Sequence, residues 1–318
     1  MADKPVLVML GGATPHVRER LSGRFQTVEW TDGKAPSEAP EAVAATVYAG
    51  GRCPAATIDA MPKLRVIGNY GVGYDGVDAE HAASKGIVVT NTPDVLDDEV
   101  ANTAILLLLA VDRKLVPYDR YVRDGRWERE GAPPLTRGVR GRTVGIVGLG
   151  RIGSTVAEKL EGAFGARIVY HSRSSKDVPY PYYPNLVAMA RDVDALIVVT
   201  PGGPDTEKLI SREVMEALGP EGTLVNISRG TVVDEAAMIE LLQSGALGAA
   251  GLDVFEREPH VPEALRAMSQ VVLAPHIGSA TEETRAAMGD LMVDNVFAVM
   301  DGKPPLTPVP ECEDIASA

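Results

Sequence analysis

The stretch Thr143-Val-Gly-Ile-Val-Gly148-Leu-Gly150-Arg-Ile-Gly153-Ser-Thr-Val-Ala-Glu-Lys-Leu160 decides the fold of this chain. It begins as a β-rich apolar run, turns on glycines, and continues with apolar residues at helical spacing, at Ile152, Val156 and Leu160. The three glycines follow the pattern Gly-x-Gly-x-x-Gly. Between a strand and a helix, this pattern predicts a turn that binds a dinucleotide.

Each glycine has a physical reason to be there. Gly148 permits the tight turn, Gly150 lets a pyrophosphate approach the backbone, and Gly153 lets the helix and the strand pack closely. Free N–H groups at the helix N-terminus would bind the phosphates. The alternative is a glycine-tightened turn without a ligand. The expected cofactor-binding residues of this turn are Gly148, Leu149, Gly150, Arg151, Ile152 and Gly153.

The length and charge of the chain limit the number of domains and the kinds of partner to expect. A chain of 318 residues suggests two domains, and a formal charge of −13 argues against nucleic acid or an anionic membrane as the main partner. Two cysteines, Cys53 and Cys312, suggest neither a disulfide framework nor a zinc site. The polar residues 1–5 do not resemble a signal peptide, and the most apolar helix, around residues 104–110, is too short to span a bilayer. A cytoplasmic protein is expected.

Short apolar runs alternate with helical stretches along most of the chain, which predicts parallel sheets with helices on their faces. In the first part the expected strands are residues 6–10, 27–30, 45–49, 64–69 and 86–91. From residue 143 the expected strands are 144–147, 167–170, 195–200, 223–227, 248–252 and 271–273. Six strands that open on the glycine turn are typical of the doubly wound nucleotide-binding fold.

Two helical segments organise the domains. One is expected from about residue 98 to residue 121, kinked at Pro117, and is followed by an irregular connection over residues 125–138. The other, residues 281–300, follows the complete nucleotide domain and is expected to return to the first domain. The prediction is therefore α/β, with two doubly wound parallel-sheet domains. A Rossmann dinucleotide-binding domain (99–283) is inserted into a discontinuous, flavodoxin-like substrate-binding domain (1–98 and 284–318).

Ligands bind outside the carboxyl ends of the strands in open parallel sheets, so polar residues that follow strands are the candidates. In the first domain the candidates for substrate binding are Tyr70, Val72 and Gly73. In the second domain, the candidates for cofactor binding at or near strand ends are Thr200, Pro201, Ile227, Ser228, Asp253 and Gly278. Arg229 and His276, also at strand ends, are candidates for substrate binding and catalysis. We expect these positions to converge on one cleft between the domains.

The cofactor is expected to be NADP(H), with NAD(H) possible. About twenty residues past the glycines, where an acidic residue would bind the ribose 2′-hydroxyl of NAD, the chain has His171-Ser172-Arg173-Ser174. An arginine with neighbouring hydroxyl groups suits a 2′-phosphate, and no carboxylate is present there to repel it. The alternative is that Ser172, Arg173 and Ser174 are ordinary loop residues.

Reduction of a carbonyl by a nicotinamide requires a proton source, and a substrate carboxylate requires a cation. His276 can donate the proton, a paired Glu258 would stabilise its imidazolium form, and Arg229 can form a forked pair with a 2-oxo-carboxylate. The alternatives are a packed strand-end histidine, a Glu258-Pro259 turn, and an arginine at a helix N-terminus. No ligand motif for a metal accompanies the histidines, so metal catalysis is not expected.

At these residues the sequence resembles the D-isomer-specific 2-hydroxyacid dehydrogenase family over nearly its whole length. The motifs that carry the resemblance are Gly148-Leu-Gly-Arg-Ile-Gly153, Asn226-Ile-Ser-Arg-Gly230, Gly251-Leu-Asp-Val-Phe-Glu-Arg-Glu-Pro259 and Pro275-His-Ile-Gly278. Segments 170–174, 92–95 and 306–309 are most similar to the family's NADPH-preferring glyoxylate/hydroxypyruvate reductases and hydroxyphenylpyruvate reductases.

The resemblance implies roles for single residues. His276 would be the acid/base with Glu258 as its partner, and Arg229 would bind the substrate carboxylate and carbonyl. Asp253 would bind the nicotinamide carboxamide, and the backbone amides of Val72 and Gly73 would form a nest for the carboxylate. It also implies a homodimer built on the nucleotide domains, in which Trp127 could reach the active site of the partner subunit.

The leading hypothesis is NADPH-dependent reduction of a small 2-oxoacid (glyoxylate, hydroxypyruvate or 4-hydroxyphenylpyruvate) to the D-2-hydroxyacid. One rival is a dinucleotide-sensing binding protein of the same fold without significant turnover. Another is a dehydrogenase of the formate or phosphite type. Turnover of 2-oxoacids distinguishes the first from the second, and oxidation of formate or phosphite would reveal the third.

Overall fold

The computed structural model describes residues 4–31, 33–48 and 50–316, and the chain forms two compact units. The first unit comprises the residues up to Leu96 together with those from Thr281 onward, and the second spans Asp97–Ala280. The expected boundaries, after residues 98 and 283, lie slightly further along the chain. Residues 1–3, 32, 49 and 317–318, which the expected domains and the third expected strand include, lie outside the described residues.

The first unit is built on a five-stranded parallel sheet with the strand order β2-β1-β3-β4-β5. This is the 2-1-3-4-5 order of flavodoxin-like folds, and all five expected strands are present. The strands are β1 (Val6–Leu10), β2 (Gln26–Trp30), β3 (Ala42–Val47), β4 (Val66–Asn69) and β5 (Val88–Thr90). The helices are α1 (Pro15–Arg24), α2 (Ala55–Asp59), α3 (Ala79–Ser84), α12 (Glu282–Met300) and α13 (Glu313–Ala316).

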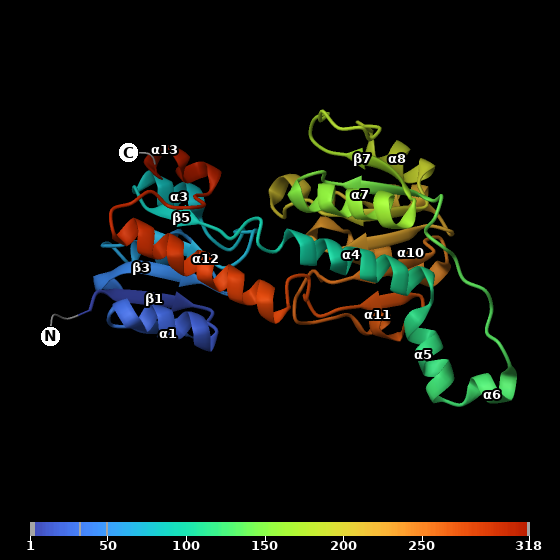
Figure 1. The fold of residues 1–318 in the computed structure, drawn as a ribbon, viewed down its shortest axis with the longest axis horizontal. Coiled ribbons are helices and arrows are strands. Elements are labelled where there is room, and N and C mark those ends of the chain that lie inside the picture. Colours follow the sequence, from blue (N-terminus) through green and yellow to red (C-terminus); the bar gives the residue numbers. More distant parts are fainter. Residues whose placement is uncertain (1–3, 32, 49, 317–318) are drawn as a thin grey trace. The chain divides into compact units, whose positions relative to one another are not determined.

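Helix α12 returns to the first unit, as the sequence predicted, and packs on β4 beside α1 (Figure 1). A glycine makes the close approach possible. A Cβ atom on Gly68 would lie 2.9 Å from Cγ2 of Val296 and 3.0 Å from Cγ of Met292. Because a larger side chain would push the helix off the sheet, Gly68 is required for this packing.

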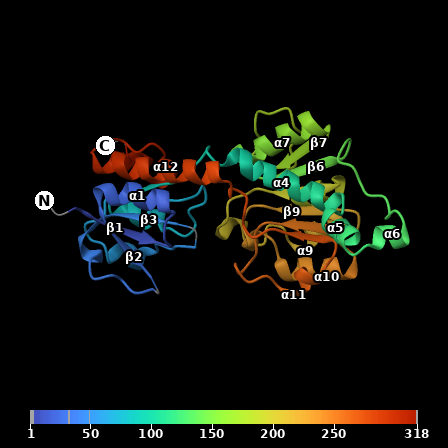
Figure 2. The same cartoon turned by 60° about the horizontal axis from the view of Figure 1, so that its bottom comes forward.

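The second unit is built on a six-stranded parallel sheet with the order β11-β10-β9-β8-β6-β7, and all six expected strands are present (Figure 2). The strands are β6 (Thr143–Val147), β7 (Arg167–His171), β8 (Ala195–Val198), β9 (Thr223–Asn226), β10 (Ala249–Leu252) and β11 (Val271–Leu273). Beyond β7, a single parallel bridge joins Tyr170 to Tyr182. If this bridge is counted as the third strand, the order becomes the 3-2-1-4-5-6 of the Rossmann fold, extended by one strand.

The helices of the second unit are α4 (Asp97–Asp112), α5 (Leu115–Arg123), α6 (Arg126–Glu130), α7 (Arg151–Phe164), α8 (Leu186–Asp192), α9 (Arg212–Leu218), α10 (Glu235–Ser244) and α11 (Glu263–Ala267). Short 3₁₀ turns occur at Ala39–Glu41, Pro204–Thr206, Gly230–Val232 and Pro310–Cys312. No helix in the described part of the chain is long and apolar enough to cross a membrane.

The long helix expected up to residue 121 is interrupted, but the predicted kink at Pro117 was wrong. The break lies at Lys114, whose backbone is left-handed with φ 51°, and α5 begins at the next residue. Pro117 therefore falls in the first turn of α5, where its missing N–H would have no partner in any case. The connection expected to be irregular also contains a short helix, α6, which carries Trp127.

A buried carboxylate ties the end of α4 to the starts of two strands. Asp112 is 6% exposed, and its carboxylate accepts hydrogen bonds from Arg142 and from Oγ1 of Thr223, the latter at 2.8 Å. Burial raises the pKa of Asp112, although the charge of Arg142 and the hydrogen bond from Thr223 oppose the rise. The ion pair with Arg142 is therefore what makes the buried charge tolerable at neutral pH.

We expect Arg142→Met to lower the free energy of unfolding by about 3 kcal/mol, because it leaves a buried carboxylate without its cation. Urea unfolding at pH 7 measures this. The exposed Arg140→Met is the control and should cost less than about 0.5 kcal/mol. Because the pKa of Asp112 is already raised, the defect should shrink as the pH falls toward 4 and Asp112 becomes protonated. Equal stability of the two variants at pH 7 would show that Asp112 does not need Arg142.

Candidate active site

The glycine turn between β6 and α7 is shaped to receive a phosphate. Gly148 has φ +99°, and a Cβ atom there would lie 2.9 Å from the backbone nitrogen of Thr200. A Cβ atom on Gly153 would lie 2.2 Å from the carbonyl oxygen of Gly148. A Cβ atom on Gly150, in contrast, would meet no atom within 4 Å, and Gly150 is the N-cap of α7, without a side-chain hydrogen bond to the helix. The N-terminal N–H groups of α7 are therefore accessible to an anion.

Thr200, which follows β8, adds a second indication of a ligand. Its Oγ1 atom is buried and has no hydrogen-bond partner among the described residues. A buried hydroxyl without a partner is costly unless a ligand or a water satisfies it. Together with the open face at Gly150, this fits the diphosphate of a dinucleotide.

The segment that follows β7 exposes a cation. His171 donates from Nδ1 to the carbonyl oxygen of Tyr183 at 2.8 Å, and Ser172 donates to the carbonyl oxygen of Ser174 at 2.6 Å. These two hydrogen bonds fix the conformation of the loop that begins at the end of β7. Arg173 is exposed, and its guanidinium forms no ion pair with any described residue. It is therefore available to a ligand phosphate, whereas Ser172 already uses its hydroxyl hydrogen.

A buried carboxylate holds the turn that carries His276. Asp253 follows β10 and is 1% exposed. Its Oδ1 accepts from the N–H of Ile277 at 2.7 Å, its Oδ2 accepts from the N–H of Gly278 at 2.8 Å, and its carbonyl oxygen accepts from the N–H of His276 at 2.8 Å. Burial raises the pKa of Asp253, and the two backbone donors oppose the rise. This structural role was not recognised from the sequence.

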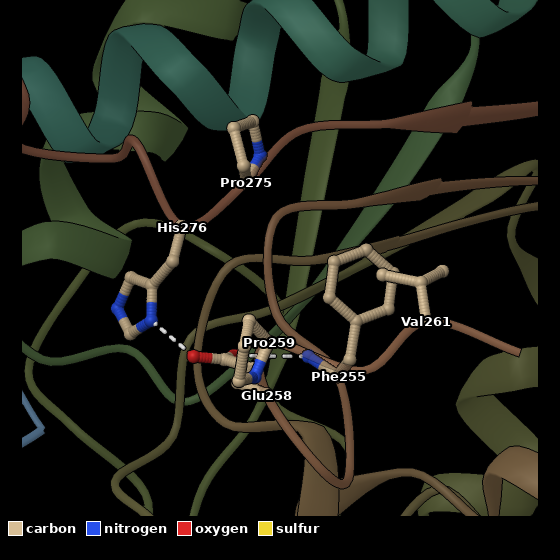
Figure 3. A pocket seen from close by; sticks show the side chains of 6 residues that line it. All are labelled: Phe255, Glu258, Pro259, Val261, Pro275 and His276. Carbon is tan, nitrogen blue, oxygen red and sulfur yellow. Dashed lines mark hydrogen bonds and ion pairs between the residues drawn. The ribbon is translucent and has the colours of Figure 1, made fainter.

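His276 and Glu258 form a direct pair (Figure 3). The Nδ1 atom of His276 lies 2.7 Å from Oε2 of Glu258, and Oε1 of Glu258 accepts from the N–H of Phe255 at 3.0 Å. His276 has φ +55°, a conformation that is uncommon for a residue with a side chain and is often found at functional sites.

The surroundings of Glu258 favour its ionised form. Burial alone would raise its pKa, but the hydrogen bonds from His276 and Phe255, together with the charges of His276 and Arg229, lower the pKa below its ordinary value. A carboxyl group with a lowered pKa in the folded state stabilises the fold at neutral pH. This stability is lost only as the pH falls through that lowered pKa.

Arg229 reaches the same site from the end of β9. It is half-buried, precedes the 3₁₀ turn Gly230–Val232, and donates from one guanidinium nitrogen to the carbonyl oxygen of Ser228 at 2.8 Å. The next residue, Gly230, presses against the β10 loop, because a Cβ atom there would lie 1.9 Å from the carbonyl carbon of Phe255. The loops after β9 and β10 are thus locked together, and Arg229, Glu258 and His276 lie in one rigid neighbourhood.

The other expected cofactor residues of this unit have mainly structural contacts in the chain itself. The backbone N–H and the hydroxyl of Ser228 both donate to Asn226 at 3.0 Å, and Ile227 is buried. A Cβ atom on Gly278 would lie 3.2 Å from Oδ2 of Asp253. Leu149 is buried, Ile152 is half-buried and Pro201 is exposed.

A mostly apolar cavity of about 110 Å³ adjoins the His276–Glu258 pair. Its lining residues are Phe255, Glu258, Pro259, Val261, Pro275 and His276, and Figure 3 shows how they surround it. Four of these residues had no role in the sequence analysis. Phe255 and Pro259 belong to the same motif as Glu258, but nothing in the motif distinguishes a cavity wall from packing.

In the first unit, the loop after β4 is held by its carbonyl groups. Asn69 donates to the carbonyl oxygens of Gly71 and Gly73 at 3.1 and 3.0 Å, and Asn91 donates to that of Val72 at 2.9 Å. The N–H groups of Val72 and Gly73 have no acceptor among the described residues. Two such neighbouring donors can bind a carboxylate.

Tyr70, an expected substrate residue, is 6% exposed. Its ring stacks on Tyr48 at a centroid distance of 4.0 Å, and its hydroxyl donates to the carbonyl oxygen of Arg285 at 2.8 Å. Burial is the main reason that its pKa is raised. In the first unit by itself, the side chain of Tyr70 therefore contributes to the packing against α12.

No group of three or more His, Cys, Asp or Glu side chains in the described ranges could hold a metal ion. The N–H groups at the start of α7 and the exposed guanidinium of Arg173 are donors that suit an anionic ligand.

Comparisons with known proteins agree with this chemistry. Residues 105–278 match the family "D-isomer specific 2-hydroxyacid dehydrogenase, NAD binding domain". The hydroxyphenylpyruvate reductase of Plectranthus scutellarioides is 46% identical over 95% of this chain and 98% of its own length. A glyoxylate/hydroxypyruvate reductase of Arabidopsis thaliana is 50% identical over 79% of this chain and 80% of its own length.

Among solved structures, an NADPH-dependent glyoxylate/hydroxypyruvate reductase of Sinorhizobium meliloti, in complex with NADP and malonate, has a TM-score of 0.92. It is 48% identical, and the match covers 97% of this chain and 98% of that chain. Family match, full-length relatives and structural similarity lead to one conclusion: the chain is an oxidoreductase that belongs to the D-isomer-specific 2-hydroxyacid dehydrogenase family.

Proposed function

We propose that this protein reduces a small 2-oxoacid to the D-2-hydroxyacid with NADPH, and that His276 donates the proton. The observation that carries the proposal is the 2.7 Å contact between Nδ1 of His276 and a Glu258 carboxylate that is itself held by the N–H of Phe255. This arrangement commits Nδ1 to the carboxylate and makes Nε2 the nitrogen that can exchange a proton with substrate.

The chain's own groups account for the acid–base part of the reaction. NADPH, when bound, supplies the hydride from C4 of the nicotinamide to C2 of the oxoacid. The carbonyl oxygen then takes the proton from Nε2 of His276, which becomes neutral and regains a proton from solvent. Because the pKa of Glu258 is lowered, its carboxylate stays ionised and stabilises the imidazolium form that must be present at the start.

Substrate binding is assigned to Arg229 and to the loop after β4. The guanidinium of Arg229 can form paired hydrogen bonds with the carboxylate and the keto oxygen of a 2-oxoacid. In the first unit, the N–H groups of Val72 and Gly73, which have no acceptor among the described residues, can also bind a carboxylate. Asp253 would accept from the nicotinamide carboxamide in addition to supporting the His276 turn. Tyr70 would line the substrate site through its backbone position rather than through its hydroxyl, which is already engaged.

The glycine turn and Arg173 support NADP(H) as the preferred cofactor, with NAD(H) as a weaker one. Arg173 is exposed in the loop after β7, where we expect a ribose 2′-phosphate to bind, and the similar structure from Sinorhizobium meliloti is described as an NADP complex. The names of the relatives support glyoxylate, hydroxypyruvate and 4-hydroxyphenylpyruvate as the substrates to test first.

Loss of reduced-cofactor absorbance, followed with NADPH and NADH in parallel, tests the proposal directly. The substrates would be glyoxylate, hydroxypyruvate, 4-hydroxyphenylpyruvate and pyruvate, and formate and phosphite would be tested with the oxidised cofactors. We expect 2-oxoacid turnover with a preference for NADPH. Tight cofactor binding without any turnover would favour the dinucleotide-sensing protein instead.

The histidine pair gives the first mutational prediction. We expect His276→Ala to reduce kcat/KM at least ~10²-fold, because the proton donor is lost. Glu258→Gln keeps the shape but not the charge, so the decline of reductase activity on the alkaline side of the pH profile should move to lower pH. Stopped assays from pH 5 to 10 measure both effects. An E258Q profile that coincides with the wild-type profile would contradict the proposed role of the carboxylate.

The cofactor preference gives the second prediction. We expect Arg173→Ala to raise KM for NADPH about tenfold and to leave KM for NADH within about twofold, because only NADPH carries the 2′-phosphate. Arg191→Ala, which removes another exposed arginine of the same unit, is the control for net charge. Equal changes with NADPH and NADH would show that Arg173 does not recognise the 2′-phosphate.

We further propose a homodimer formed through the second unit, with Trp127 contributing to the active site of the partner subunit. Helix α5 buries none of its residues within the chain, and the exposed apolar side chains around it include Leu115, Val122, Trp127 and Leu135. An exposed apolar area of this kind is typical of a protein interface.

We also propose that the protein is cytoplasmic. Its two cysteines are buried and free, which is compatible with this location.

The dimer gives the third prediction. We expect Leu115→Glu to convert the protein to monomers, because it places a charge in the interface. Light scattering coupled to size-exclusion chromatography measures the mass. Leu306→Glu is the matched control, since Leu306 is 58% exposed and Leu115 is 56% exposed, and Leu306 lies in the first unit. A dimer that survives L115E unchanged would locate the interface elsewhere.

A further inference from the structure

Two charged residues begin neighbouring helices of the second unit and form an ion pair. Asp97 is the first residue of α4, and Arg151, in the glycine turn, is the first residue of α7. Nε of Arg151 lies 3.5 Å from Oδ2 of Asp97, and the side chains are 56% and 12% exposed, respectively. The pair therefore joins a well-buried carboxylate to an accessible guanidinium.

The position of Arg151 is unfavourable unless an anion is near. The N-terminus of a helix carries a partial positive charge, so a cation in its first turn is repelled, whereas an anion is stabilised. The first turn of α7 contains no acidic residue, and its N-cap, Gly150, has no side chain to accept a hydrogen bond. The carboxylate of Asp97 offsets the charge of Arg151 from outside the helix. At the N-terminus of α4, Asp97 is itself in a favourable place.

The same end of α7 is where the open face of Gly150 and the unpartnered Oγ1 of Thr200 indicate a ligand phosphate. A diphosphate there would bring two negative charges to the N-terminus of α7. Arginine binds phosphate oxygens through paired, charge-assisted hydrogen bonds, and the 3.5 Å distance between Nε of Arg151 and Oδ2 of Asp97 is longer than such a bond.

We propose that Asp97 is an internal counter-ion that competes with the cofactor diphosphate for Arg151. The inference rests on the proposed dinucleotide site. Without cofactor, Asp97 neutralises Arg151. When the diphosphate binds, Arg151 turns to the phosphate oxygens, and the ion pair between Asp97 and Arg151 is broken close to a new anion. Part of the binding free energy is therefore used to separate the pair, and Asp97 lowers the affinity for both NADPH and NADH, because the diphosphate is common to the two.

The test is the affinity of Asp97→Asn for each dinucleotide, measured by quenching of intrinsic fluorescence at several salt concentrations. We expect Kd to fall about three- to fivefold for both NADPH and NADH, the upper part of the range of a partly exposed ion pair. Asp98→Asn is the matched control, because it removes the same charge one residue along, from an exposed carboxylate that pairs with Lys159 at 2.6 Å. It should change Kd less than about twofold.

Arg151→Gln shows whether the effect passes through the pair. If Asp97 acts by competing for Arg151, the gain from D97N should disappear in the R151Q background. An equal gain in that background would mean simple repulsion between Asp97 and the cofactor, and would overturn the proposal. Weaker binding of D97N would also overturn it, because it would make Asp97 a direct ligand of the cofactor.

Two further measurements keep the outcomes distinct. Asp97→Ser retains a hydrogen-bonding side chain at the start of α4 and should bind both dinucleotides as tightly as D97N does. That result would show that the tighter binding does not come from disruption of the helix. Wild-type protein that binds neither dinucleotide would contradict the proposed function itself. Wild-type protein that binds NADPH, with D97N unchanged, would contradict only the role of Asp97.

Discussion

The site depends above all on the carboxylate of Asp253. It is buried at the end of β10, and its two oxygens accept from consecutive backbone N–H groups, those of Ile277 and Gly278. A third bond joins its carbonyl oxygen to the N–H of His276. This clamp holds the turn that gives His276 its left-handed backbone and directs the imidazole toward Glu258. Burial raises the pKa of Asp253, which means that burial disfavours its ionised form. The two backbone N–H donors oppose this effect, so the ionised carboxylate and the turn that it holds stabilise each other.

Close backbone contacts extend this rigidity to the rest of the site. Gly230 allows the loop that carries Arg229 to rest on the backbone of Phe255, and the N–H of Phe255 in turn holds Glu258. Gly153 allows α7 to rest on the carbonyl of Gly148. A methyl group at either contact would have to displace backbone rather than a flexible side chain. These segments therefore pack directly on each other, and neither can shift without moving the other. Charges placed on such loops keep their distances, as acid–base chemistry requires.

The electrostatics of the second unit follow one logic. The buried carboxylates of Asp112 and Asp253 and the partly exposed carboxylate of Glu258 each accept hydrogen bonds from a different element. The anion expected as ligand, in contrast, would meet donors that have no acceptor among the described residues. These donors are the first-turn N–H groups of α7 and the exposed guanidinium of Arg173. An overall negative chain with local donors at strand ends can thus bind an anionic cofactor without being a general anion binder.

The sequence by itself determined the local elements and the family. Alternating apolar runs gave every strand of both sheets, and Gly-x-Gly-x-x-Gly between a strand and a helix identified the nucleotide fold, because periodicity and glycine requirements act over a few residues. It failed at Pro117, because the effect of proline depends on its position within a helix, and at Arg126–Glu130, because a helix of five residues is too short to have a clear period. Strand-end rules also selected His276 and Arg229 as candidates, and Glu258 was chosen as a carboxylate that could pair with His276.

Only the tertiary structure decided what those residues touch. The contact of Glu258 with His276 joins residues 18 apart, and the clamp of Asp253 on Ile277 joins residues 24 apart. The pair of Asp97 with Arg151 joins two helices whose packing no local pattern specifies. Such contacts depend on strand order, crossover and loop packing. A sequence read at short range determines which groups are present and where strands end, but the distances between groups are set by the burial of the whole sheet.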